Sequence, residues 1–225
     1  MKLPRFFMGT IALCVFAVNA KAQTIPGDPK ADKFYAELYA GATIVPDSQL
    51  SNPAFSGADV QAEFDTGFNF GGTLGYKMKN GLRIEGEYTY RRADFNDITA
   101  CVSGSCTSAS SLGIDVGGDL SMHAVMANAF WEPRFGNWLP SIGGGAGVGI
   151  IDATLKASAF GASSSDNESD TVFAYQAGAG IGYEFSPNII ALLDYRYWAT
   201  QDPDLGGTKA EISTHNINIG IRYQF

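Results

Sequence analysis

Hydrophobic and polar residues alternate with a period of two along most of this chain. In residues 33–45, one set of alternate positions contains Phe34 and Leu38, and the other contains Glu37 and Thr43. Such alternation indicates a β-strand whose two faces meet different surroundings. The pattern recurs in residues 65–78, 82–92, 139–151, 173–185, 189–198 and 214–225. Residues 120–131 are a further predicted strand, but His123 and Asn128 fall on opposite faces, so its orientation stays open.

Short and long connections alternate between these eight predicted strands. Short turns are expected at Asn80-Gly81, at residues 133–137 and at residues 186–188, and Asn-Gly is a strong hairpin signal. Long loops rich in Ser, Gly and Asp are expected at residues 45–63, 93–118, 152–170 and 199–211. This arrangement predicts an all-β fold, an eight-stranded antiparallel up-and-down transmembrane β-barrel with short periplasmic turns and four long extracellular loops.

The charged residues decide which face of the barrel points outward. One face of the strand at residues 82–92 carries Arg83, Glu85, Glu87 and Arg91, which cannot pack into a hydrocarbon core. An eight-stranded lumen only just holds its side chains, so we place the large apolar set against lipid and the polar set inside. A soluble lipocalin-like barrel, with the faces exchanged, is the alternative fold.

Two sets of residues follow from this orientation. Aromatic residues expected in girdles at the membrane interfaces are Tyr88, Tyr90, Trp131, Trp138, Tyr183, Phe185, Tyr195, Tyr197 and Trp198. Residues expected to form an ion network in the barrel interior are Glu37, Lys77, Arg83, Glu85, Glu87, Arg91, Glu184, Asp194, Arg196 and Arg222. Because both signs are present in this interior set, we expect a plugged lumen; a small pore, which would show one dominant sign, is an alternative.

Residues 1–22 have the features of a cleaved signal peptide. Lys2 and Arg5 precede an apolar run at residues 6–18, and Ala20-Lys21-Ala22 offers a cleavage site before Gln23. The run is too short for a membrane helix. We therefore expect export, a short periplasmic segment at residues 23–32, and a barrel over residues 33–225.

Charge narrows the possible partners. The chain has 15 Lys and Arg against 23 Asp and Glu, and removing the three basic residues of the signal peptide leaves 12 against 23, a net charge of −11. Such an acidic balance argues against nucleic acid as a partner, because binding its phosphates requires concentrated positive charge. The acidic residues of the predicted loops are Asp47, Asp59, Glu63, Asp97, Asp115, Asp119, Asp152, Asp166, Glu168, Asp170, Asp202, Asp204 and Glu211, opposed by Lys156 and Lys209.

Two cysteines remain after the predicted cleavage. Cys101 and Cys106 flank a short Ser/Gly segment, which favours a disulfide in an oxidising compartment. Zinc is the alternative, but no second cysteine pair exists and neither histidine is near in sequence.

Other candidate chemistries are weak. The glycines of residues 143–149 lack the Lys-Ser/Thr of a phosphate loop, so they are interpreted as barrel glycines. Residues 163–170 lack the spacing of a calcium loop and are interpreted as a solvated surface loop. Ser121 with His123 and Ser213 with His215 share strand faces, which leaves a Ser-His enzyme as an alternative. We expect no enzyme activity, no cofactor and no resident metal.

Several segments resemble a known family. Residues 125–128, 140–147 and 175–184, together with the terminal IRYQF at residues 221–225, are similar to strands of the small outer-membrane β-barrel proteins of Gram-negative bacteria. That group includes the membrane domain of outer membrane protein A, the neisserial opacity proteins and alphaproteobacterial surface antigens. The resemblance implies an outer-membrane location and structural, antigenic or adhesive surface roles, whose host ligand it does not specify.

The resemblance also implies partners and an assembly signal. Positions that match the signal read by the barrel-assembly machinery are Ile217, Ile219, Ile221, Tyr223 and Phe225. Implied partners are outer-membrane lipid and lipopolysaccharide, the assembly machinery with periplasmic chaperones, and a host surface ligand. Barrels of this kind that deacylate lipid A resemble a His-x-Ser order, whereas here Ser precedes His.

Overall fold

The computed structural model describes residues 33–46, 48–50, 58–102, 105–108, 111, 115–159, 162–201, 204–205, 208–209 and 212–225. The predicted signal peptide at residues 1–22 and the segment at residues 23–32 lie outside the described residues. No helix in the described ranges is long and apolar enough to cross a membrane.

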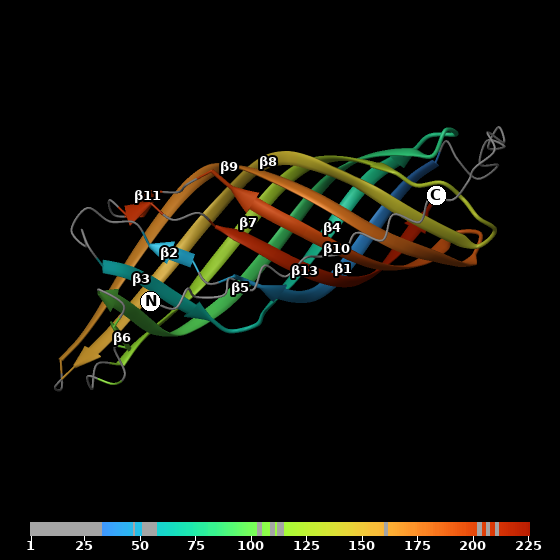
Figure 1. Cartoon of the computed structure of the whole chain (residues 1–225). Coiled ribbons are helices and arrows are strands. Elements are labelled where there is room, and N and C mark those ends of the chain that lie inside the picture. Colours follow the sequence, from blue (N-terminus) through green and yellow to red (C-terminus); the bar gives the residue numbers. More distant parts are fainter. Residues whose placement is uncertain are drawn as a thin grey trace, which may run out of the picture.

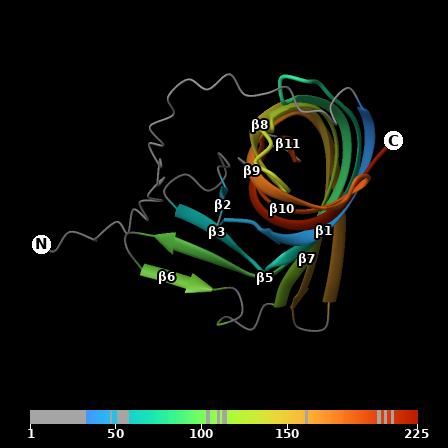
Figure 2. The same ribbon diagram turned by 90° about the vertical axis from the view of Figure 1, so that its right-hand side faces the viewer.

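Eight long strands form one closed antiparallel ring (Figures 1 and 2). They are β1 (Lys33–Ile44), β4 (Gly67–Lys77), β5 (Leu82–Val102), β7 (Asp115–Trp131), β8 (Trp138–Ala159), β9 (Ala162–Ser186), β10 (Ile189–Thr200) and β13 (Ser213–Gln224). Each strand pairs with its neighbours in chain order, and β1 pairs with β13 to close the ring. This confirms the predicted eight-stranded up-and-down barrel.

Five short strands lie in the segments expected to be long loops. They are β2 (Ser48–Leu50), β3 (Ala58–Phe64), β6 (Ser105–Ser108), β11 (Asp204–Leu205) and β12 (Thr208–Lys209). β2, β3 and β6 extend the sheet beside the far half of β5, and Figure 2 shows them leaning to one side of the ring.

The boundary predicted for the segment at residues 152–170 was wrong. β8 and β9 stay paired from Trp138 and Tyr183 out to Ala159 and Ala162, so a long two-stranded ribbon replaces most of the expected loop. A ribbon satisfies the backbone hydrogen bonds of each strand toward the other without needing an apolar face. The Ser-rich composition that suggested a loop is therefore compatible with strand.

The register between β5 and β6 bears on the predicted disulfide. Cys101 lies directly opposite Cys106 in this antiparallel pair. The side chains of both residues lie outside the described set. The disulfide remains a prediction.

The three short turns lie at one end of the barrel. Gly81, after β4, has a φ of 83°, and Gly136, after β7, has a φ of 63°, a backbone region that favours glycine. Met78 N and Leu82 O are 2.8 Å apart across the first turn, which contains the predicted Asn80-Gly81 signal. The paired positions of Lys33 with Lys77 and of Tyr35 with Gln224 place both ends of the barrel sequence at this turn end.

The two faces of the ring differ sharply in chemistry. Leu38 and Ile219 point outward and expose 73% and 68% of their surfaces, whereas Arg222 and Glu37 point inward and expose 0% and 3%. Only lipid makes such an outer face stable, because water would leave a continuous band of large apolar side chains exposed. The predicted orientation is confirmed and the lipocalin-like alternative is wrong.

The structure also resolves the orientation of β7, which the sequence left open. Asn128 and Phe130 point inward and are buried, while Val125 and Trp131 point outward. His123 therefore lies on the outer surface. Near the loop end, the inward face of β7 is apolar and joins a buried cluster inside the barrel: Leu120, Met122, Ala124, Met126, Ile151, Ala174, Trp198 and Ile212.

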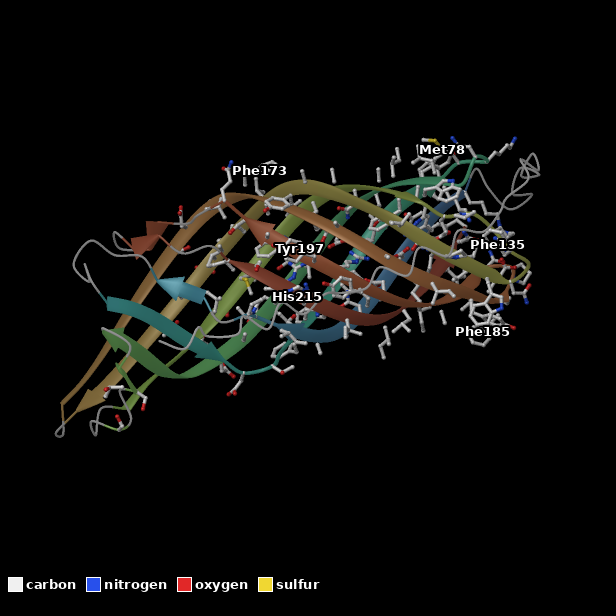
Figure 3. The ribbon with its side chains drawn as sticks, viewed as in Figure 1. Met78, Phe135, Phe173, Phe185, Tyr197 and His215 are labelled. Atoms are coloured by element: carbon white, nitrogen blue, oxygen red, sulfur yellow. The ribbon has the colours of Figure 1, made fainter. Side chains whose placement is uncertain are left out.

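Aromatic side chains on the outer surface gather near the two rims of the apolar band. Phe135 and Phe185 lie at the turn end, and Phe173, Tyr197 and His215 lie nearer the loop end (Figure 3). The assignment of Trp198 to the girdle was wrong, because its side chain is completely buried inside the barrel. Trp198 is two residues from the inward-pointing Arg196, so it shares the inward face.

Candidate functional site

The barrel interior contains a network of ion pairs that begins near the turn end. Glu132, directly after β7, lies among three cations from three strands. Its Oε1 is 3.0 Å from Lys77 Nζ and 2.8 Å from Arg222 Nη1, and its Oε2 is 3.3 Å from Arg83 Nε. All four side chains are buried. Strands β4, β5 and β13 are thereby tied to the end of β7.

Glu37 of β1 and Glu85 of β5 continue this network along the lumen, away from Glu132. Arg222 Nε donates to Glu37 Oε1 at 2.6 Å, and Arg83 Nη1 donates to the same oxygen at 2.8 Å. Arg83 Nη1 also donates to Glu85 Oε2 at 2.9 Å, and the Tyr35 hydroxyl donates to that oxygen at 2.5 Å. Each carboxylate thus has charged or hydroxyl donors, which buried charges require.

A second group of charges lies around Arg196 of β10. Arg196 Nη1 donates to Glu87 Oε2 of β5, and Arg196 Nε donates to Asp194 Oδ1 at 2.8 Å. Asn128 Nδ2 donates to Glu87 Oε2 at 3.0 Å, and Gln176 Nε2 donates to Asn128 Oδ1 at 2.8 Å. The group joins β5, β7, β9 and β10 across the lumen.

Inward-facing glycines make room for the large side chains of the network. A Cβ at Gly75 would overlap the Tyr35 ring, and a Cβ at Gly71 would lie 2.5 Å from the Tyr39 hydroxyl oxygen. By contrast, Gly86 points outward and has nothing within 4 Å of such an atom. Small residues beside long ones allow a narrow interior to fill.

Glu184, which we predicted in the network, lies near the turn end with a different partner. Its Oε2 is 2.5 Å from Nη1 of Arg134, a residue in the turn after β7. Arg134 was absent from the predicted set. Arg134 reaches Glu184 because the turn after β7 folds back toward β9, where Glu184 N donates to Asn137 O at 2.9 Å.

Arg91 differs from the other interior cations. Its guanidinium lies 4.8 Å from the centre of the Trp198 ring, and no carboxylate among the described residues forms an ion pair with it. Arg91 Nε and Nη1 have no hydrogen-bond partner within the described part of the chain. Its cross-strand neighbour is Met122 of the apolar cluster, so Arg91 marks the level where the ionic interior changes to an apolar one.

Sequence reasoning missed two functional residues that the alternation could have found. Glu132 lies between the predicted strand at residues 120–131 and the predicted turn at residues 133–137, yet it follows Asn128 and Phe130 on the inward face of β7. Trp198 follows Arg196 in the same way on β10. Extending each face by two residues would have predicted both positions.

The two candidate Ser-His pairs have other partners in the structure. The Tyr88 hydroxyl is 2.8 Å from His123 Nδ1, and the Tyr195 hydroxyl is 2.6 Å from His215 Nδ1. The Ser121 hydroxyl is 3.3 Å from the Tyr90 hydroxyl. A Ser-His catalytic pair needs a hydrogen bond between the two side chains, and among the described residues neither serine bonds to its histidine, whose Nδ1 contacts a tyrosine instead.

The described residues contain no cluster of three or more His, Cys, Asp or Glu side chains suited to a metal ion. Of the acidic segment at residues 163–170, considered as a cation loop, the side chains up to Glu168 lie outside the described set.

The Glu132→Gln substitution tests the centre of the network. It leaves three buried cations with one carboxylate fewer, so the free energy of unfolding should fall by about 3–5 kcal/mol. Urea unfolding of the barrel refolded into lipid vesicles, followed by tryptophan fluorescence, measures this change. The matched control is Asp94→Asn, because exposed Asp94 meets Arg92 only at 3.5 Å and its loss should cost less than about 1 kcal/mol. Equal losses in the two variants would contradict the assigned role of Glu132.

Replacing Arg91 and Arg222 by methionine should have opposite consequences. Arg91→Met removes a buried cation without a carboxylate partner and keeps contact with Trp198, so stability should stay within about 1 kcal/mol of wild type or rise. Arg222→Met leaves Glu37 and Glu132 without their shared guanidinium and should cost about 3–5 kcal/mol. The same urea titration compares them, and a larger loss for Arg91→Met would show that Arg91 has a partner of its own.

Solved structures of several bacterial outer-membrane proteins are similar in fold to this barrel. OprG from Pseudomonas aeruginosa has a TM-score of 0.51 and 16% identity, covering 89% of this chain and 99% of its own. A major outer membrane protein from Thermus thermophilus has a TM-score of 0.53 and 10% identity, covering 85% and 99%. The outer membrane protease OmpT from Escherichia coli has a TM-score of 0.57 and 9% identity, covering 86% and 97%.

At these identities, the solved structures show a common fold and nothing finer. A comparison with curated proteins finds no match. The sequence does match the family described as Outer membrane protein beta-barrel domain over residues 9–225. Because this match spans nearly the whole chain, the protein belongs to the outer-membrane β-barrel family.

Proposed function

We propose that this protein is a plugged outer-membrane barrel whose role lies at its exposed acidic loop end, in surface interaction such as adhesion to a host. The observation that carries the proposal is the ion network, which ties strands together across the lumen. Arg222 of β13 reaches Glu132 at the end of β7, and Arg196 of β10 reaches Glu87 of β5. These contacts occupy the space that a conducting path would need.

The alternative of a small pore finds little support in the interior. A cavity of about 20 Å³, lined by Glu37, Arg83 and Arg222 among others, has room for about one water molecule. Cations and anions lie in direct contact, whereas a selective pore presents a row of one sign to the passing ion. The apolar cluster on the inward face of β7 also interrupts any wetted path toward the loop end.

The alternative of a lipid-A-modifying enzyme is also disfavoured. Both candidate histidines use Nδ1 to contact tyrosine, and no carboxylate bonds to either ring among the described side chains. OmpT, a protease, shares the fold at 9% identity, which carries no activity over to this chain. We therefore propose a role without a catalytic cycle or a cofactor.

The acidic loop end supplies the interaction surface in this proposal. Asp94 and Asp119 lie directly opposite each other on β5 and β7, with Arg92 3.5 Å from each. Two carboxylates to one guanidinium leave this patch negative, in line with the acidic composition of the loop segments. A surface of this charge attracts basic partners by long-range steering. Outer-membrane lipid, lipopolysaccharide and the barrel-assembly machinery are further proposed partners.

Planar-bilayer recording tests the plug. The wild-type barrel should show no sustained channel current in concentrated KCl, because paired charges close the lumen. The Glu87→Ala, Arg196→Ala double variant removes a cross-lumen pair and should give measurable current. The control, Arg92→Ala with Asp94→Ala, removes an exposed pair and should stay silent. Regular ion-selective steps from the wild-type protein would support a pore instead.

Binding of fluorescent poly-lysine tests the acidic surface. Wild-type barrel in phosphatidylcholine vesicles should bind poly-lysine at about 20 mM NaCl and release most of it at about 500 mM, because salt screens exposed charges. Neutralising three carboxylates, with Asp166→Asn, Glu168→Gln and Asp170→Asn, should weaken binding about threefold or more. The control exchanges Asp for Glu and Glu for Asp at the same positions and keeps the charge. Poly-lysine binding that is unchanged both by salt and by the triple substitution would refute a role for the acidic loops.

A further inference from the structure

Two similar clusters of tyrosine and histidine lie on the lipid-facing surface. The β10–β13 cluster consists of Tyr195, Tyr197 and His215, and the His215 ring lies 6.0 Å and 5.4 Å from the two tyrosine rings. Figure 3 shows Tyr197 and His215 side by side toward the loop end. Histidine is an unusual residue on an apolar outer face. Neither the plug nor the acidic loops uses it.

Strand geometry places His215 at the outer boundary of the apolar band. Ten residues separate it from Phe225, which lies at the turn end, and at about 3.3 Å per residue they span about 33 Å along the strand. With the usual tilt of about 40°, this length corresponds to a height of about 25 Å, which matches the apolar band of such barrels. His215 therefore lies at the level where acyl chains end and lipid head groups begin.

The β10–β13 cluster presents hydrogen-bond donors that have no acceptor among the described residues. The Tyr195 hydroxyl oxygen and His215 Nδ1 are 2.6 Å apart, and in the tautomer with the ring proton on Nε2 the hydroxyl donates to Nδ1 and the Nε2 proton is left for a ligand. The Tyr197 hydroxyl has no described partner, and Ser213 lies two residues before His215 on the same face of β13. Three donors thus share one outward face, and none of them is matched by an acceptor in the described part of the protein.

We propose that the β10–β13 cluster binds the phosphate of an outer-leaflet lipid head group. Phosphate oxygens are strong acceptors, and hydrogen bonds to a charged group are stronger than those between neutral groups. The elements that face the cluster carry no described charge: the residue of β1 opposite His215 is Ile44, and the residues of β9 opposite the tyrosines are Ala177 and Ala179. Nothing described there repels an anion.

The cluster of Tyr88, Tyr90, Ser121 and His123, here the β5–β7 cluster, is an internal comparison. It repeats the Tyr-x-Tyr and His arrangement, with the Tyr88 hydroxyl on His123 Nδ1. Its surroundings are acidic, however. Charged neighbours on the adjoining strands are Arg92 and Asp94 of β5, Asp119 of β7, and Asp152 of β8, which lies opposite Ser121. The excess of carboxylates should make this cluster the weaker phosphate site.

NMR on the refolded protein over residues 23–225 can test the proposal, because the sequence contains only two histidines, one in each cluster. The protein is labelled with carbon-13 at Cε1 of its histidines and held in dodecyl maltoside micelles. Each cluster then gives one ring resonance. Titration with diphosphoryl lipid A should shift the His215 resonance saturably, and shift that of His123 only at several-fold higher concentration. Diacylglycerol, a phosphate-free lipid, and inorganic phosphate are the two comparison ligands.

Two tyrosine variants decide whether the cluster itself holds the phosphate. Tyr197→Phe removes one donor and should weaken lipid A binding about fivefold at His215. Tyr223→Phe changes an exposed tyrosine of the same outer face at the turn end and should leave binding unchanged. Native mass spectrometry of the lipid-bound barrel provides an independent measure of the same affinities.

Five results would overturn the proposal. An equal shift with diacylglycerol would indicate a change of lipid surroundings only, and an equal shift with inorganic phosphate would assign the site to a free anion. Unchanged affinity in Tyr197→Phe would remove the cluster from binding. Absence of a saturable shift at His215, or saturation of His123 first, would contradict the electrostatic argument.

Discussion

Closure of the hydrogen-bonded ring is the constraint on which the rest of this structure depends. Inside a bilayer, no water satisfies the backbone N–H and C=O groups, so a sheet must pair its first strand with its last. Here β1 pairs with β13 from Tyr35 to Ile44. Once the ring is closed, every strand has one face toward lipid and one toward a narrow lumen. The alternation seen in the sequence is the direct consequence.

The closed lumen then imposes its own chemistry. Charged side chains that point inward lose their water and must find partners across a space only a few side chains wide. Arg83 meets Glu37, Glu85 and Glu132, each from a different part of the chain. These contacts fill the interior and tie strands that are not neighbours. The charged side chains that neutralise one another inside the barrel therefore also fill the space through which ions or water would pass.

The fold could be predicted from the sequence, while the network could be predicted only in part. Alternation placed Leu38 outside and Glu37 inside, since one residue of offset reverses the face. Glu132 was missed because the strand was taken to end at Trp131. The choice of partners could not be predicted, since the meeting of Arg196 with Glu87 depends on the strand stagger around the ring. The β8–β9 ribbon was missed because a polar strand in water shows no apolar face.

The position of Glu132 has a consequence for how the chain enters a membrane. Two of its three cations, Lys77 and Arg83, come from the β4–β5 hairpin near the start of the barrel, and the third, Arg222, belongs to the final strand. Because Arg83 also serves Glu37 and Glu85, the three carboxylates are balanced by three cations only after Arg222 of the final strand is in place. In a half-assembled sheet the cluster would carry an unbalanced negative charge close to lipid, so the pairing of β13 with β1 and the neutralisation of the interior charges depend on the same strand.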